Sequence, residues 1–134
     1  MNDSHYEKTT SDVTVKVEPQ YLDDQSTPSE SHFVWAYRVV IENKGAESVQ
    51  LRARYWRITD ANGLTQEVQG EGVVGSQPVI LPGDSYEYSS GTPLPTPTGF
   101  MVGTYTMQKP GGEVITVDIP AFSLDSPYQS AIRH

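Results

Sequence analysis

Regular alternation of apolar and polar residues runs through much of the chain and predicts β-strands. In the first such segment, residues 13–22, alternate positions from Val13 to Val17 are valine, so one face of the strand is apolar and the other is polar. In the segment from His32 to Asn43, aromatic and aliphatic residues alternate without a break. This second segment is expected to form a central strand, buried on one face.

A third segment, from Val49 to Thr59, shows the same period. The alternation places Val49, Leu51, Ala53 and Tyr55 on one face and Gln50, Arg52, Arg54 and Trp56 on the other. The sequence Asp60-Ala61-Asn62-Gly63 follows and is typical of a hairpin turn. Residues 92–98 carry three prolines, and proline supplies no N–H to a strand ladder, so this segment is not expected in a central strand.

Glycine (11) and proline (10) recur about every ten residues between these short segments, and helical periodicity is absent from the pattern. The sequence therefore predicts an all-β fold, an antiparallel β-sandwich of about seven or eight strands in the immunoglobulin or fibronectin type III style. Residues 13–127 are expected to form the domain, residues 1–12 a flexible N-terminal segment and residues 128–134 a C-terminal tail.

Composition and charge narrow the range of functions. The 134 residues include 17 acidic and 9 basic ones, a net charge of −8, which argues against wrapping nucleic acid through phosphate contacts. No apolar run is long enough for membrane insertion, and the polar start lacks the features of a signal peptide, so a cytoplasmic protein is expected. The chain has no cysteine, which excludes disulfides and thiolate zinc sites.

Gly70, Gly72 and Gly75 match the pattern GxGxxG of dinucleotide-binding proteins. That pattern requires a helix after the glycines, and the sequence Ser76 to Gly83 cannot supply one. Two interpretations remain open. The glycines either allow positive φ angles and close backbone contacts between strands, or they expose consecutive N–H groups that bind an anion.

Basic residues are concentrated between positions 38 and 57, where Arg52 and Arg54 are candidates to assist anion binding at the glycine loop. The alternative is that long arginine stems cover the solvent face of a sheet while their heads pair with acids on neighbouring strands. Trp56, Tyr86 and Tyr88 are candidates for a partner-binding patch if they are exposed together. An uncovered strand edge could also accept a peptide strand from a partner.

Groupings that would support catalysis are missing from the sequence. The three histidines are far apart and form no metal-binding spacing, and no serine lies in a nucleophile motif. We therefore expect no catalytic residues, no metal site, no cofactor and no enzymatic activity.

Several unlike motifs occur in a fixed order along residues 11–127: ARYWRITDANGLTQEVQGEGVVGSQPVILPG, then YSSGTPLPTPTGFMVGTY, then IPAFSL. In this combination the chain resembles the ApaG family (ApaG domain, DUF525). The resemblance implies a β-sandwich without enzymatic activity, an association with cobalt resistance and magnesium efflux, and a role in protein interaction. It also implies binding of pyrophosphate-like groups through the glycine loop, here Gly70, Gly72 and Gly75.

Together these observations favour a non-enzymatic, cytoplasmic binding module that engages a protein partner and is linked only indirectly to cobalt resistance and magnesium efflux. The alternative is a phosphate, pyrophosphate or nucleotide sensor that binds a phosphate-containing small molecule through the glycine loop, with help from Arg52 or Arg54.

Overall fold

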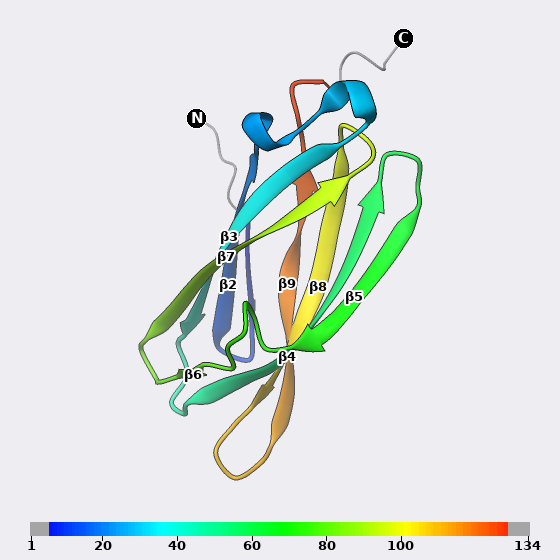
Figure 1. Ribbon diagram of the computed structural model, residues 1–134. Helices are drawn as coiled ribbons and strands as arrows, with labels where there is room; N and C mark the ends of the chain where they lie inside the picture. Colours follow the sequence, from blue (N-terminus) through cyan, green and yellow to red (C-terminus); the bar gives the residue numbers. More distant parts are fainter. Residues whose placement is uncertain (1–5, 129–134) are drawn as a thin grey trace.

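The structure, a computed structural model that describes residues 6–128, consists of two antiparallel sheets packed face to face (Figure 1). In spatial order the first sheet contains β1 (Tyr6–Thr10), β2 (Val13–Tyr21), β3 (Phe33–Asn43) and β7 (Ser85–Leu94). The second contains β5 (Thr65–Glu71), β4 (Val49–Asp60), β8 (Gly99–Gln108) and β9 (Val114–Leu124), and the short β6 (Val79–Ile80) pairs with β4. Two 3-10 turns, η1 (Asp23–Gln25) and η2 (Pro28–Glu30), link β2 to β3.

The predicted all-β, two-sheet antiparallel sandwich is confirmed, while its likeness to immunoglobulin or fibronectin domains stays a prediction. Within residues 6–128 the structure has nine strands, more than the seven or eight expected. One of them, β1, falls in the segment 1–12 that was expected to be flexible, and it pairs along its whole length with β2. Residues 1–5 and 129–134 lie outside the described residues.

The core lies between the sheets and is built from the alternating positions that the sequence indicates. In β3 every second residue from Phe33 to Ile41 is buried, and in β2 the three valines are buried as well. Trp35, near the start of β3, is fully buried, and its indole Nε1 donates a hydrogen bond of 2.8 Å to the carbonyl of Asp125. A buried indole is therefore satisfied by the segment that follows β9.

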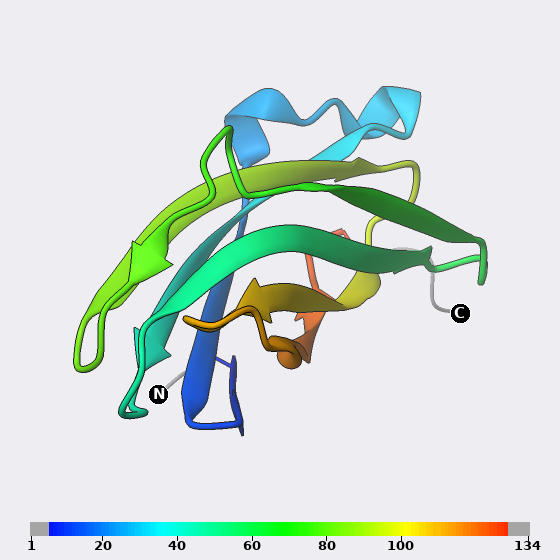
Figure 2. The ribbon, with the colours of Figure 1, turned by 90° about the horizontal axis from the view of Figure 1, so that it is seen from below.

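The two long sides of the sandwich differ. On one side β1 and β2 pack against β9 and close the space between the sheets. On the other side lie β7 and β5, the outer strands of the two sheets, and we call this the open side. Figure 2 shows the loop between β5 and β6 reaching toward β7 at this side. Among residues 6–128, no helix is long and apolar enough to cross a membrane.

A β-bulge in β4 changes which side chains face the core. The pairing with β8 shifts between Leu51 and Ala53, so Arg52 is an extra residue without a partner in β8. The predicted alternation holds up to Leu51 and then reverses, because an inserted residue turns every later side chain to the opposite face. Trp56 is buried, with 3% of its surface exposed, whereas Tyr55 is on the outer face. The expectation that Trp56 lies on the solvent face beside Arg52 was wrong.

Candidate functional site

The glycine motif forms a tight hairpin at the open side. Gly70 of β5 is paired with Arg54, and after the next pair, Glu71 with Ala53, the chain leaves the sheet. The amide of Val73 donates to the carbonyl of Ser76 (2.8 Å), and the amide of Ser76 donates back to Val73 (2.9 Å). The two residues between them, Val74 (φ 47°) and Gly75 (φ 79°), both have left-handed backbones, as a type I′ turn requires. We call residues 72–76 the glycine hairpin.

The glycines differ in how strictly they are required, because a Cβ at Gly72 would meet a backbone atom, whereas a Cβ at Gly70 would meet the end of a flexible side chain. Gly72 has φ 64°, and a Cβ at this position would lie 2.2 Å from the carbonyl oxygen of Ser76. At Gly70 a Cβ would lie 2.8 Å from the guanidinium of Arg54. The hairpin therefore needs glycine for positive φ and for close approach, which is the first of the two interpretations given for the motif.

The glycine hairpin is fixed to the bulge in β4. The carbonyl of Arg52 accepts hydrogen bonds from the amide of Gly72 (2.9 Å) and from Nε2 of Gln77 (2.8 Å). Val73, at the base of the hairpin, is only 1% exposed and belongs to the core. The hairpin thus spans the place where β5 ends and β6 begins, with one apolar side chain directed inward.

Arg54 joins this hairpin to the interior. It lies on the inner face of β4, paired with Tyr105 in β8, and its Nη1 donates to the carbonyls of Glu71 (3.1 Å) and Gly72 (2.8 Å). Arg52 is exposed on the other side of the bulge, and its Nη1 lies 3.4 Å from the amide oxygen of Gln50. The two arginines proposed for one site therefore have separate surroundings.

A group of tyrosines occupies the space between the sheets next to Arg54. The hydroxyls of Tyr88 and Tyr105 are hydrogen-bonded to each other, and that of Tyr37 is bonded to Ser90. Desolvation raises the pKa of Tyr37, Tyr88 and Tyr105 above the usual value, and the positive charge of Arg54 opposes this rise at all three. We call these three residues the tyrosine cluster.

Because of these pKa shifts, the free energy of unfolding is expected to fall with rising pH above about pH 10. Below that pH the tyrosines are protonated in both states and the stability is fully present. Above it, the unfolded chain releases protons that the folded cluster retains, so each cluster tyrosine lowers stability by up to about 1.4 kcal/mol per pH unit. Urea unfolding between about pH 9 and 12 measures the slope.

Tyr88→Phe is the variant for this experiment. It should make the fall of the unfolding free energy with pH less steep by the contribution of one tyrosine. A slope of zero in the wild-type protein over this range would contradict the prediction. So would tyrosinate absorbance from the cluster that develops while the protein is still folded.

Of the three aromatic residues predicted to bind a partner, the structure brings two together. Tyr86 and Tyr88 are neighbours on the inner face of β7, with ring centroids 6.4 Å apart, and both are partly exposed at the open side. Trp56 is in the core, where its ring packs edge-on against Tyr37 (5.4 Å) and Phe122 (5.9 Å). The three residues therefore do not form one exposed patch.

Amides of the glycine hairpin are largely engaged by the protein itself. Those of Gly72, Val73 and Ser76 all donate to carbonyls, as described above. Within residues 6–128 no hydrogen-bond partner is found for the amides of Val74 and Gly75, at the tip. The tip also carries an exposed apolar side chain, since Val74 is 67% exposed.

Sequence analysis did not single out the exposed aliphatic residues around this tip. Val79 and Leu81 flank the buried Ile80 and are 57% and 55% exposed. We call Val74, Val79 and Leu81, three exposed aliphatic residues that lie close together in the sequence, the apolar tip. The alternation of Val79 and Leu81 with Ile80 was the signal that could have found them, because a short strand buried on one face leaves its other side chains in solvent.

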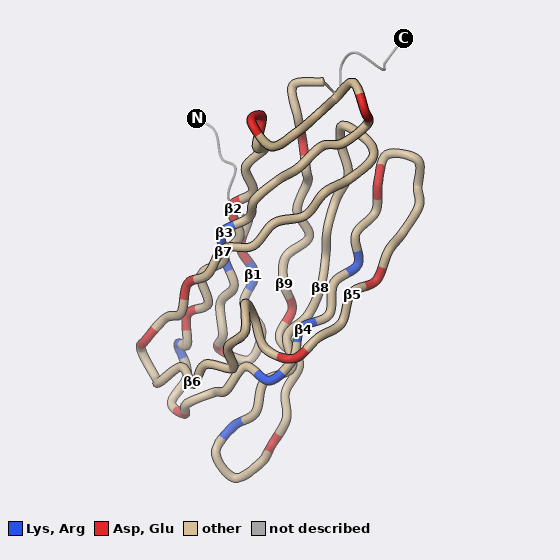
Figure 3. The backbone as a smooth tube through the Cα atoms, in the orientation of Figure 1, with Lys and Arg blue, Asp and Glu red and all other residues tan. Residues whose placement is uncertain are grey.

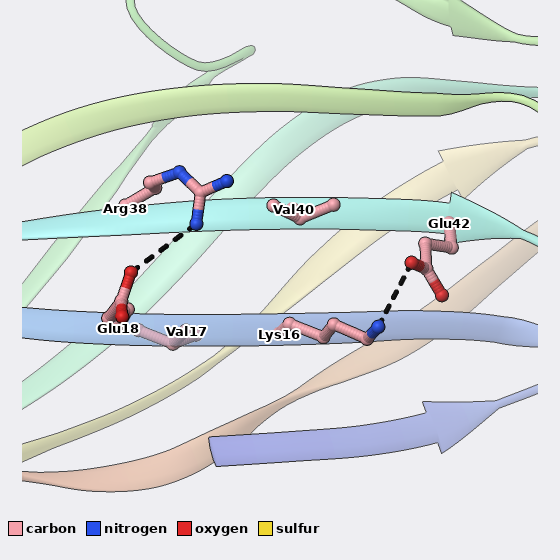
Figure 4. Close-up of a pocket in the computed structure, with 6 residues that line it drawn as sticks. All are labelled: Lys16, Val17, Glu18, Arg38, Val40 and Glu42. Atoms are coloured by element: carbon pink, nitrogen blue, oxygen red, sulfur yellow. Dashed lines mark hydrogen bonds and ion pairs between the residues drawn. The ribbon is translucent and has the colours of Figure 1, made fainter. Parts of the chain in front are cut away.

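Several charged residues elsewhere form ion pairs with one another. A hollow of about 290 Å³ on the outer face of the first sheet is crossed by the ion pairs Arg38–Glu18 (3.3 Å) and Lys16–Glu42 (3.1 Å), seen in Figure 4. Figure 3 shows acidic and basic residues interleaved along the middle of the strands, whereas the charged residues drawn at the upper end of the molecule are acidic. Among residues 6–128, His, Asp and Glu form no group of three that could hold a metal ion.

Fold and site together define the class of protein: a two-sheet β-sandwich domain whose glycine motif builds a hairpin, which separates it from the dinucleotide-binding proteins that share the motif. The family model described as the ApaG domain matches residues 23–109. The chain belongs to the ApaG family, as the resemblance of its motifs predicts.

Relatives with this family name match almost the whole chain. The chain is 63% identical over 124 residues to Protein ApaG of Paramagnetospirillum magneticum, covering 92% of this chain and 95% of that protein. It is 60% identical over 123 residues to Protein ApaG of Rhodospirillum centenum, with the same coverage. The crystal structure of an ApaA protein from Bordetella pertussis has a TM-score of 0.84 at 47% identity, covering 87% of this chain and 94% of that one.

Proposed function

We propose that this chain is a non-enzymatic, cytoplasmic protein-binding module and that its apolar tip contacts the partner. The observation that carries the proposal is the backbone of Val74. A β-branched residue with φ 47° is a conformational outlier, and the strain of such a backbone lowers the stability of the folded state by an amount of order 1–3 kcal/mol.

Within residues 6–128, packing of the Val74 side chain does little to offset this cost. Its side chain is 67% exposed, so it gains little from packing against its own chain. Asparagine in its place would form the Asn-Gly pair that type I′ turns prefer. A strained residue that presents an apolar side chain to solvent therefore points to a contact made with another molecule.

The neighbours of Val74 support the same proposal. Three exposed aliphatic side chains lie between positions 74 and 81 in a chain of net charge −8. Exposed apolar groups that gather in one segment are typical of interaction sites, while scattered ones are not. On this proposal, any contribution to cobalt resistance or magnesium efflux is made through the partner.

The geometry favours protein binding over the sensor of phosphate, pyrophosphate or nucleotides. Such a sensor needs N–H donors that converge on the ligand. Here the amide of Gly72 and the Nη1 group of Arg54 both donate to carbonyls of the chain, and Arg52 lies apart from Arg54. The apolar tip offers a surface suited to a protein instead.

Val74→Asn tests the proposal because it should affect stability and binding in opposite directions. Relief of the strained backbone should raise the free energy of unfolding by about 1 kcal/mol. Loss of the apolar side chain should abolish capture of the proteins that the tagged wild-type chain retains from a lysate of its own organism. Leu64→Asn is the matched control, since Leu64 is 69% exposed but lies near the β4–β5 turn. Capture of the same proteins by Val74→Asn and the wild type would contradict the proposal.

A further inference from the structure

We propose that the partner enters as an extended segment that adds to β7 as a new strand of the first sheet. The inference rests on the proposed function, because it specifies how a protein partner binds beside the apolar tip. Strand addition requires a free sheet edge with unpaired N–H and C=O groups. Among residues 6–128, the edge strand β6 has only two residues, and the other four edge strands, β1, β7, β5 and β9, differ in how far they meet this requirement.

The edges at the closed side are short or covered. β1 is five residues long. In β9 the amide of Asp118 donates to Oγ1 of Thr10 (3.2 Å) and that of Ser123 donates to the hydroxyl of Tyr6 (3.4 Å), so side chains of β1 occupy this edge. Pro120 also interrupts β9. Neither strand offers a long, open row of donors and acceptors.

The open side offers two edges, of which β7 is the better acceptor. β5 is seven residues long and carries Glu67 and Glu71, and acidic residues on an edge discourage pairing. β7 is ten residues long, and Glu87 is its one charged residue. It is therefore the longer and less charged of the two edges.

Hydrogen bonds at the ends of β3 establish which groups of β7 face outward. The carbonyl of Val34 accepts from Leu22 beside β2, and the amide of Asn43 donates to Asp84 on the β7 side. The backbone N–H and C=O groups of the even-numbered residues of β3 thus point toward β2, and those of the odd-numbered residues point toward β7. The β7 residues paired with the odd-numbered ones are Tyr86, Tyr88, Ser90 and Thr92.

The remaining β7 residues therefore direct their backbone groups away from β3. These are Ser85, Glu87, Ser89 and Gly91, followed by Pro93. Proline at the next outward position fits this assignment, because its nitrogen has no hydrogen to donate. Within residues 6–128, none of the four outward amides is found to donate a hydrogen bond to another segment. The available edge thus extends from Ser85 to the residue before Pro93.

The side chains beside this edge indicate the chemistry of the added strand. Residues of that strand on its inner face would lie beside the partly exposed rings of Tyr86 and Tyr88, which favours apolar residues. Those on its outer face would lie beside Glu87, whose side chain is 54% exposed and whose Oε2 also accepts from Nε of Arg38 (2.6 Å), in a chain that is acidic as a whole. The segment that fits best alternates apolar and basic residues.

Continuity with the apolar tip supports this edge. Leu81 is separated from the start of β7 by the turn 82–84 alone. A segment paired with Ser85 to Gly91 would therefore end next to the tip, and a partner could contact both.

Amide shifts of the isotope-labelled protein test the inference, with a capped peptide of about ten alternating valine and lysine residues as the probe. We expect shifts and slowed hydrogen exchange at Ser85, Glu87, Ser89 and Gly91. Ser89→Pro removes one outward N–H without touching the β3 ladder and should weaken binding by about tenfold. Ser89→Ala keeps that N–H and should bind as the wild type does.

A second variant leaves the backbone intact. Glu87→Lys should lower the affinity for the valine–lysine peptide and raise the affinity for an alternating valine–glutamate peptide, by roughly threefold or more in each case. The inference is overturned if the valine–lysine peptide produces no shifts at millimolar concentration, or if the shifts map to β5 or β1. Equal binding by Ser89→Pro and Ser89→Ala would also overturn it.

These outcomes are separable from those of the proposed function. If Val74→Asn loses its partner while the β7 amides stay unperturbed by the peptide, strand addition is wrong and partner binding at the apolar tip stands. If the peptide binds β7 and Val74→Asn retains its partner, the apolar tip is the part that fails.

Discussion

Alanine at position 72 is expected to lower the free energy of unfolding by about 3 kcal/mol or more. Two effects add. A residue with a Cβ has an unfavourable backbone energy at φ 64°, by roughly 1–2 kcal/mol. The Cβ would also lie 2.2 Å from the carbonyl oxygen of Ser76, so the hairpin would have to move away from the bulge carbonyl of Arg52 that holds it. Urea unfolding of the variant measures the loss.

Gly75→Ala is the matched control for this experiment. Gly75 also has a positive φ, 79°, but a Cβ there meets no atom within 4 Å. This variant should lose only the conformational part, about 1 kcal/mol. Equal losses at the two positions would show that the close contact with Ser76 has no energetic importance, contrary to the structure.

Replacement of Trp56 by alanine should destabilise the protein by about 3–5 kcal/mol, the range observed for large aromatic residues in cores. The indole packs against the rings of Tyr37 and Phe122, and Gly103 leaves room for it, since a Cβ there would lie 3.0 Å from the indole ring. Alanine would leave a cavity there that neighbouring side chains can fill only in part. The thermal midpoint and urea unfolding report the effect.

Tyr55→Ala is the control, because Tyr55 is the adjacent residue but points to the outer face of β4. It should cost about 1 kcal/mol or less. If Trp56 were a surface residue for partner binding, as the sequence alternation suggests, its replacement would cost no more than that of Tyr55. The comparison therefore tests the position of the bulge directly.

Strands with strong alternation could be predicted from the sequence. In β2 and β3 the residues that alternate in the sequence are the ones buried in the structure, since one face of each strand packs against the second sheet. β1 could not be predicted in this way. Its sequence YEKTT has no apolar alternation, because it is held by backbone pairing with β2 and by contacts of Tyr6, Lys8 and Thr10 with β9.

The bulge at Arg52 explains why the candidate site was only partly predicted. Nothing in the sequence Leu51-Arg52-Ala53 distinguishes an inserted residue from a regular strand, so Trp56 and Arg54 were assigned to the wrong face. The bulge is stabilised by contacts with the glycine hairpin, which comes about twenty residues later in the chain. Periodicity within a single strand carries no information about such distant contacts.

For the glycine motif, the need for positive φ at a glycine could be predicted, but the positive φ of the neighbouring Val74 could not. The need for positive φ and close approach at Gly72 follows from the choice of glycine. The left-handed backbone of Val74 does not, because valine is a residue type that avoids this region. Binding of an anion by the loop amides stays a prediction.

The bulge in β4 also bears on which changes in chain length the fold tolerates. The side chain of Arg52 is in solvent and has no role in the core, so many residue types would serve at this position. Deletion of the residue is a different matter, because it would rotate the rest of β4 by half a turn and bring Trp56 and Ile58 into water. The fold thus requires a residue at position 52 but not a particular residue type. At position 72, by contrast, the hairpin requires glycine itself.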